Sequence, residues 1–266
     1  MTNYQTKLRV QNTKRTYNNI HSVYKLMNIN IKSEIPFFIS FMGRSGSSFL
    51  VSLLSDHPEI VCRGEIFGLS PEKKKKFSDN EAIIKGLNNI YSGKTKANGF
   101  KFKYPGQYDY YSEIYKYLLS YSDVMRVIFL YRKNRLKAAI SRQNLTRLTK
   151  MGKKANLDES SFVKLDKLNL DINQALRNID KRIELDEKYR NQLRNFKYTY
   201  TVAYEDLYSN TQSIMENIYS FLQVDSSHQA SGTTRKITDD NFANSISNYD
   251  ELSDKIKSTK YETYLQ

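Results

Sequence analysis

The sequence has few of the side chains that bind metals or form disulfides. Cys62 is its only cysteine, so an internal disulfide is excluded and a reducing compartment is favoured. Because Cys62 follows an isoleucine and a valine, we predict a small core residue and not a nucleophile. The histidines are His21, His57 and His228, and no His/Asp/Glu set has the spacing of metal ligands, so we expect no metal site.

Long apolar runs are also missing. None approaches the roughly 20 residues of a transmembrane helix, and residues 1–34 lack the apolar segment of a signal peptide. We therefore expect a cytoplasmic protein with no transmembrane segment. With 266 residues, no internal repeat and no low-complexity linker, the chain favours one sizeable domain, predicted over 35–266, preceded by an N-terminal arm over 1–34.

Negative charge is scarce, with 28 Asp and Glu against 42 Lys and Arg. The formal net charge of +14 and the pI near 9.5 predict an anionic partner. Nucleic acid, an acidic polysaccharide, a membrane surface or a phosphorylated cofactor would each satisfy this charge, and charge alone does not choose among them.

The most informative stretch spans residues 36–54. An apolar run of strand length (36–42) meets a Gly/Ser turn, and a helical pattern follows at 49–54. Such a strand–turn–helix unit directs backbone N–H groups and the positive end of the helix dipole at one point, which predicts a phosphate or sulfate site. The turn contains Gly43, Arg44, Ser45, Gly46, Ser47 and Ser48.

The rest of the chain alternates between apolar and amphipathic segments. Further strands are predicted at 60–62, 98–104, 124–131 and 196–203, the second of them with one polar side. Helical patterns follow at 107–121, 136–149, 155–195 and 209–222. The alternation predicts an α/β fold, a single domain with a mostly parallel central sheet flanked by helices on both faces.

Residues 43–49, followed by 56–60 and 64–67, resemble the 5′-phosphosulfate loop of the sulfotransferases. These enzymes use 3′-phosphoadenosine 5′-phosphosulfate (PAPS), and the form here is closest to the bacterial carbohydrate and lipopolysaccharide group. The resemblance implies the sulfotransferase fold with its P-loop-like phosphosulfate loop, PAPS as sulfuryl donor and no metal. It also implies that the turn binds the phosphosulfate and that Arg44 stabilises the charge on the leaving phosphate.

Two later segments extend the resemblance. Arg132 ends a strand and Ser141 lies on the next helix, and in the family such a pair holds the 3′-phosphate of PAPS. A strand-end guanidinium and a hydroxyl just over two helical turns later can converge on one phosphate; alternatively, Arg132 pairs with an acidic neighbour and Ser141 faces solvent. Arg235 and Lys236 resemble the late basic loop that closes over the nucleotide, although Ile237 replaces a glycine of the small-molecule enzymes.

The resemblance also suggests the general base. Carbohydrate sulfotransferases commonly use a glutamate, which Glu65 matches; its structural alternative is to pair with Arg63 or cap a helix. The small-molecule enzymes use a histidine where this chain has Lys103. His57 stays open as a base, although its Asp-His-Pro turn favours a local hydrogen bond. We interpret Glu205, in a Tyr-Glu-Asp-Leu segment, as orienting loops or capping a helix.

Together these features predict transfer of a sulfuryl group from PAPS to a hydroxyl of a carbohydrate or glycolipid acceptor, which the surplus charge suggests is anionic. One alternative is a P-loop-type kinase or nucleotide phosphotransferase, but the turn lacks that loop's lysine and spacing. Another is a basic nucleic-acid-binding module, yet the basic residues are dispersed and not clustered with aromatics, so we expect no nucleic-acid partner. The acceptor, the oligomeric state and the roles of 1–34 and 155–195 are left open.

Overall fold

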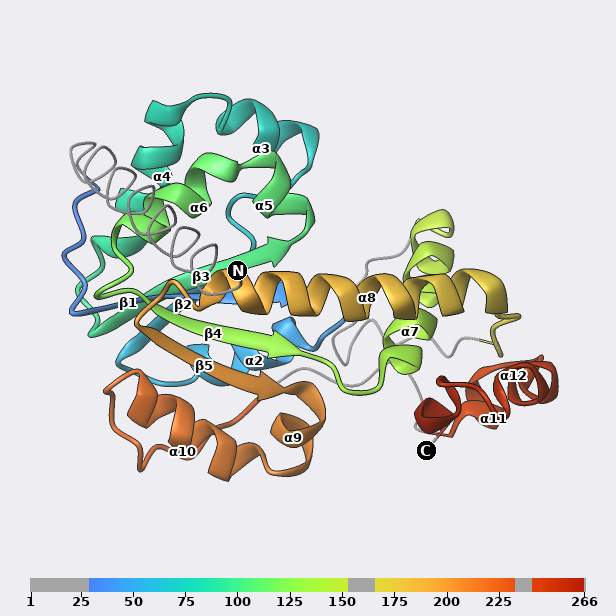
Figure 1. Ribbon diagram of the computed structural model, residues 1–266. Coiled ribbons are helices and arrows are strands. Elements are labelled where there is room, and N and C mark those ends of the chain that lie inside the picture. Colours follow the sequence, from blue (N-terminus) through green and yellow to red (C-terminus); the bar gives the residue numbers. More distant parts are fainter. Residues whose placement is uncertain (1–28, 153–165, 233–240, 266) are drawn as a thin grey trace, which may run out of the picture.

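A five-stranded parallel sheet forms the centre of the molecule (Figure 1). The computed structural model describes residues 29–152, 166–232 and 241–265. The strand order is β2-β3-β1-β4-β5, and every pair is parallel, as predicted. The strands are β1 (Ile35–Met42), β2 (Ile60–Arg63), β3 (Ala97–Tyr104), β4 (Arg126–Tyr131) and β5 (Tyr198–Ala203).

Helices cover both faces of this sheet, which confirms the α/β prediction. In Figure 1, α3 (Pro71–Lys76), α4 (Asn80–Tyr91), α5 (Gly106–Tyr110) and α6 (Ser112–Ser120) lie over one face. The opposite face carries α2 (Ser47–Ser55), α9 (Tyr204–Ser209) and α10 (Thr211–Phe221). The remaining helices are α7 (Arg135–Lys150), α8 (Ile172–Leu193), α11 (Phe242–Ser245), α12 (Tyr249–Ile256) and the 3-10 helix η2 (Glu262–Leu265).

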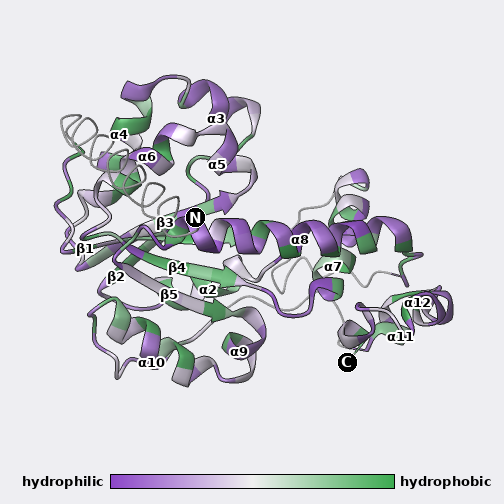
Figure 2. Ribbon diagram, in the orientation of Figure 1, coloured by the Kyte–Doolittle hydropathy of each residue, from purple (hydrophilic) through white to green (hydrophobic). Residues whose placement is uncertain are grey.

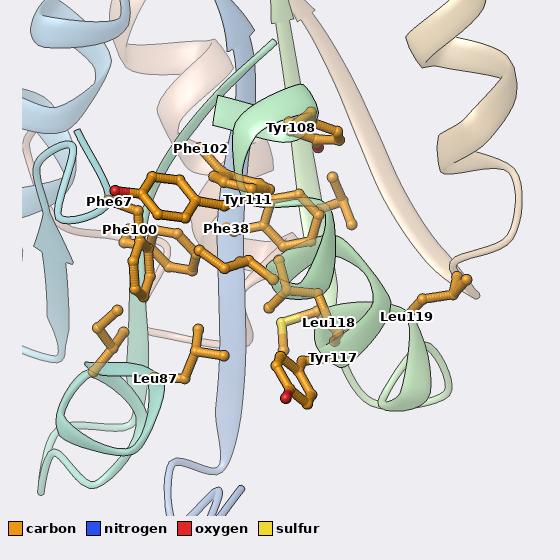
Figure 3. Packing of buried hydrophobic residues seen from close by; sticks show 14 of the residues in the cluster. Phe38, Phe67, Leu87, Phe100, Phe102, Tyr108, Tyr111, Tyr117, Leu118 and Leu119 are labelled. Carbon is orange, nitrogen blue, oxygen red and sulfur yellow. The ribbon is translucent and has the colours of Figure 1, made fainter. Parts of the chain in front are cut away.

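The central strand β1 supplies side chains to two cores. Successive residues of a strand point to opposite faces, and Phe38 packs into the aromatic cluster under α4 and α6 while Phe37 packs against α2 and α10. Figure 3 shows Phe38 among Phe100 and Phe102 of β3 and the aromatic rings of α5 and α6. The tyrosines of 107–121 are largely core residues, as predicted. Removing so many rings from water is a major source of stability for this face.

A third core lies beyond the strand ends, where α7, the start of α8, α11 and α12 meet. Leu136 and Ile140 of α7 pack with Leu252 and Ile256 of α12 in this cluster. In Figure 2 the sheet is coloured largely as hydrophobic, whereas α8 is mostly hydrophilic along its length. This long helix therefore crosses the molecule with a narrow buried stripe and a broad polar surface.

The structure departs from the sequence predictions at several elements. β3 lies between β2 and β1 and has its two lysines, Lys101 and Lys103, on one side, as predicted, but that side is largely buried and does not face solvent. The long helix begins at Ile172, so 166–171 are not helical, and α4 was not predicted. Residues 153–165 of the predicted helical segment and 1–28 of the predicted arm lie outside the described residues. No helix in the described part of the chain is long and apolar enough to cross a bilayer.

Candidate active site

The turn between β1 and α2 folds into a conformation that requires glycine at one position. Arg44 and Gly46 have φ values of 68° and 81°, in the left-handed region. A Cβ on Gly46 would lie 2.7 Å from Cε2 of Tyr204 and closer still to Cδ2. Ser45 is buried and its hydroxyl donates to the carbonyl of Met42 at 2.7 Å. The turn is thus closed by its own serine and packed beneath an aromatic ring, at the N-terminus of α2.

A lysine from β3 lies beside this turn. Lys101 is only 8% exposed, and its Nζ lies 3.5 Å from the hydroxyls of both Ser47 and Ser48 at the start of α2. Burial lowers the pKa of Lys101, and the Glu65 carboxylate opposes that shift. We did not include Lys101 among the predicted site residues. The available signal was the alternation of Lys101 and Lys103 in a strand that is otherwise apolar and buried.

Arg44, Arg132 and Ser141 meet at one place, although they are far apart in the sequence. Arg44 Nε donates to Ser141 Oγ at 2.9 Å, and Arg132 Nη1 donates to the Arg44 carbonyl at 3.4 Å. Ser141 is 5% exposed and does not face solvent. Arg132 also forms an ion pair with Glu205 at 3.6 Å and lies over the Tyr204 ring at 5.0 Å. Arg132 therefore has the acidic neighbour of the structural alternative, and it shares Arg44 as a partner with Ser141. Its role toward a 3′-phosphate stays a prediction.

The loop after β4 is held by side chains from distant segments. Glu205 accepts hydrogen bonds from the backbone N–H groups of Lys133 at 2.8 Å and Asn134 at 3.0 Å, consistent with the loop-orienting role interpreted from the sequence. Asn134 in turn caps α7, accepting from the Lys137 N–H at 2.9 Å. Its side-chain amide donates to the carbonyl of Tyr264 at 2.9 Å. These contacts fix the positions of Arg132 and of the start of α7 at the C-terminal end of β4.

A further arginine reaches the turn from α8. Arg182 is 5% exposed and donates a hydrogen bond to the carbonyl of Gly43. No carboxylate of the described residues forms an ion pair with it. Burial lowers the pKa of Arg182 to about 10, against the opposing charge of Asp186, and Arg132 adds to the lowering. No sequence pattern marks Arg182 as a site residue, since it is one of many charged residues on a polar helix.

The cations around the turn are buried or partly buried, and the arginines among them repel one another. Burial lowers the pKa of Arg44, and the nearby Arg132 lowers it further. Lys101 and Arg182 are likewise shifted downward by burial. Withdrawing several like charges from water is unfavourable unless an opposite charge compensates them. The arrangement is therefore suited to a ligand with several negative charges.

Glu65 lies on the same side of the turn as Lys101. Its carboxylate oxygens are 4.0 Å from Lys101 Nζ and 3.6 Å from Lys103 Nζ, and Gln107 donates to it at 3.1 Å. Arg63 instead donates to a backbone carbonyl, that of Asn89, at 3.4 Å. Glu65 is thus a partly exposed carboxylate held by two lysines and an amide, and the alternative pairing with Arg63 does not occur.

His57 and Cys62 have structural surroundings. Nδ1 of the buried His57 accepts from the Glu59 N–H at 3.1 Å, and Nε2 lies 2.8 Å from the Asp225 carbonyl. The hydrogen bond of Nδ1 is the local one that the Asp-His-Pro turn favours, whereas the partner of Nε2 lies 168 residues away. Cys62 is a buried core residue, as predicted, and burial raises its pKa to about 12.

Arg235 and Lys236 lie outside the described residues. Within the described ranges, no group of three or more His, Cys, Asp and Glu side chains is arranged to hold a metal ion.

Comparison with known proteins gives matches at the level of structure. No family model and no curated protein matches the chain. A sulfotransferase from Alicyclobacillus acidocaldarius aligns with 88% of this chain and 100% of its own, with a TM-score of 0.50 and 14% identity. The chain has a sulfotransferase fold. The likeness concerns the fold, in which the turn 43–48 occupies the strand–turn–helix position at the centre of the sheet.

Two further solved structures with sulfotransferase folds were also found. Mouse sulfotransferase SULT7A1, complexed with PAP, has a TM-score of 0.47 and 13% identity over 87% of each chain. The sulfotransferase domain of the olefin synthase of Synechococcus PCC 7002 has a TM-score of 0.42 and 18% identity, over 89% of this chain and 92% of that one.

Proposed function

We propose that this protein is a sulfotransferase that moves a sulfuryl group from PAPS to a hydroxyl of a carbohydrate or glycolipid. The observation that carries the proposal is the cluster of cations around the β1–α2 turn of a sulfotransferase fold, in which Lys101, Arg132 and Arg182 are buried and Arg44 is partly buried. PAPS carries a phosphosulfate at one end of its ribose and a phosphate at the other. PAPS therefore supplies negative charge at two points, which would compensate the positive charges of the cluster.

The two anionic groups of PAPS fit two parts of the site. The backbone N–H groups of turn 43–48 and the Lys101 ammonium bind the phosphosulfate, while Arg132 and Ser141 bind the 3′-phosphate. Arg44 links them, because its backbone belongs to the turn and its Nε donates to Ser141. Arg182 stabilises the turn from behind through the Gly43 carbonyl.

Sulfuryl transfer is an in-line displacement for which phosphoryl transfer gives the nearest template. The acceptor oxygen forms a bond to sulfur as the bond from sulfur to the bridging phosphate oxygen breaks. Glu65 accepts the proton of the acceptor hydroxyl. Arg44 and Lys101 stabilise the negative charge that develops on the leaving phosphate. Lys103, 3.6 Å from Glu65, keeps the base in place and replaces the histidine of the small-molecule enzymes.

The acceptor class follows from charge. A net charge of +14 exceeds what one PAPS molecule neutralises, which supports an acidic glycan or a lipid-linked sugar with anionic groups. The kinase alternative is less well supported, because none of the described strands ends in the aspartate that would hold Mg²⁺.

Calorimetric titration with 3′,5′-adenosine bisphosphate, without metal, tests this function. We expect binding, weakened more than tenfold in Arg132→Ala and in Ser141→Ala, since a hydrogen bond to a charged group contributes about 1.5–3 kcal/mol. Arg177→Ala, an exposed arginine on α8, is the control and leaves the affinity unchanged. Binding of ATP with Mg²⁺ but not of the bisphosphate would overturn the proposal in favour of a kinase.

A further inference from the structure

A cavity of about 700 Å³ lies beside the candidate active site, between α7 and α8. Its lining includes Arg142, Thr146 and Lys150 of α7 and Gln174 and Asn178 of α8. Ligand sites for small molecules commonly have volumes in this range, roughly 300–1,000 Å³. The cavity is therefore large enough for several sugar rings.

The spacing of these residues connects the cavity to the phosphosulfate turn. Residues four apart lie on one face of a helix. On α7, Arg142, Thr146 and Lys150 form such a row, which begins one residue after Ser141. On α8 the row of Gln174 and Asn178 continues with Arg182, which bonds to the Gly43 carbonyl. The α8 row thus leads from the cavity to the turn, and the α7 row begins next to Ser141 in the sequence.

The charge of the lining identifies the kind of ligand. Arg142 and Lys150 are exposed, and no carboxylate of the described ranges pairs with either of them. Arg147, by contrast, is paired with Asp166 at 3.8 Å. Arg142 also contributes to the lowered pKa of Arg182. An anion in the cavity would compensate the charge of Arg142.

The uncharged members of the lining add hydrogen-bonding capacity. The amides of Gln174 and Asn178 and the hydroxyl of Thr146 each both donate and accept hydrogen bonds, as sugar hydroxyls require. Among the described residues of the lining there is no aromatic ring for stacking a base, so their chemistry matches a single-stranded nucleic acid poorly. Cations interspersed with amides and a hydroxyl match a sugar chain that carries carboxylate, sulfate or phosphate groups.

We propose that the α7–α8 cavity binds an anionic oligosaccharide, the acceptor, and holds its charged groups against Arg142 and Lys150. This inference rests on the proposed function and specifies the acceptor class of that site. The sugar that carries the reacting hydroxyl then lies near Arg182 and the phosphosulfate turn. The other sugars of the chain lie along α7.

The test uses the full chain saturated with 3′,5′-adenosine bisphosphate. Two tetrasaccharides serve as probes: maltotetraose, which is uncharged, and tetragalacturonate, which is anionic. Calorimetry at one fixed ionic strength gives both dissociation constants. We expect tetragalacturonate to bind at least tenfold more tightly than maltotetraose. The double variant Arg142→Gln, Lys150→Gln loses this preference and retains its bisphosphate affinity.

The control variant also removes two positive charges, but outside the cavity. Lys75→Gln with Lys76→Gln changes two exposed lysines of α3, which do not line the cavity, and leaves tetragalacturonate binding intact. Equal binding of the two probes, or equal weakening in both double variants, would overturn the inference. If the wild-type protein does not bind the bisphosphate, the proposed function itself fails; if it binds the bisphosphate without preferring the anionic probe, only the acceptor site fails.

Discussion

Replacing Gly46 by alanine tests whether the β1–α2 turn is built as the structure shows. The substitution acts through two separate effects. A residue with a Cβ is disfavoured at φ 81°, by about 1–2 kcal/mol. The new Cβ would also lie 2.7 Å from Cε2 of Tyr204, so the ring must move. Its movement disrupts the contact with the Arg132 guanidinium, 5.0 Å away, which contributes about 0.5–2 kcal/mol.

Together these effects amount to about 2–4 kcal/mol, and about 2–4 °C is lost per kcal/mol in chains approaching this size. We therefore expect Gly46→Ala to lower the melting temperature by about 5–15 °C and to weaken bisphosphate binding, since Arg132 loses its support. Thermal denaturation followed by circular dichroism measures the first, and calorimetry measures the second.

Gly152→Ala separates the two effects. Gly152 has a similar φ, 70°, but nothing lies within 4 Å of where its Cβ would be. This variant should show only the conformational cost and bind the bisphosphate normally. The reasoning would be refuted if the two variants had the same melting temperature, or if Gly46→Ala stayed within about 1 °C of the wild type.

Three further predictions concern the reaction and the buried groups. Glu65→Gln should reduce sulfuryl transfer at least 100-fold, measured with an acceptor that supports turnover, with bisphosphate affinity unchanged; a parallel loss of affinity would mean a binding role. Because burial lowers the pKa of Lys101 and a bound anion raises it again, the bisphosphate should bind with proton uptake at alkaline pH and more weakly as pH rises through that pKa. Calorimetry in buffers of different ionisation enthalpy detects this uptake, and Lys101→Met should abolish it. Since burial raises the pKa of Cys62 to about 12, iodoacetamide at pH 8 should modify Cys62 only after unfolding in urea, as mass spectrometry can show; rapid labelling of the folded protein would contradict its burial.

The local parts of the fold were predictable because their signals lie within short windows. The apolar run 36–42, the Gly/Ser turn and the helical pattern after it predicted β1, the turn and α2. The strand–helix alternation predicted a mostly parallel sheet. Arg132 and Ser141 could be paired because both belong to one strand–turn–helix segment, and the structure places them with Arg44.

Lys101 and Arg182 could not be found in this way, because their roles depend on tertiary placement. Lys101 reaches the turn only because β3 pairs with β1, which places Lys101 opposite Ile39. The sequence of neither strand indicates that the two will be neighbours in the sheet. Arg182 meets Gly43 across 139 residues of chain, through the docking of α8. A polar helix gives no indication of which of its arginines will be buried.

The bond between Asn134 and the Tyr264 carbonyl has a consequence for the time at which the protein becomes active. Asn134 shapes the loop that carries Arg132, and one of its partners, Tyr264, is translated 130 residues later. Translation proceeds at about 5–20 residues per second, and domains fold as units. The sheet can pair once β5 has emerged, but the loop that carries Arg132 acquires all its supports only after η2 is made. A nascent chain with a finished sheet will therefore still lack a finished loop after β4.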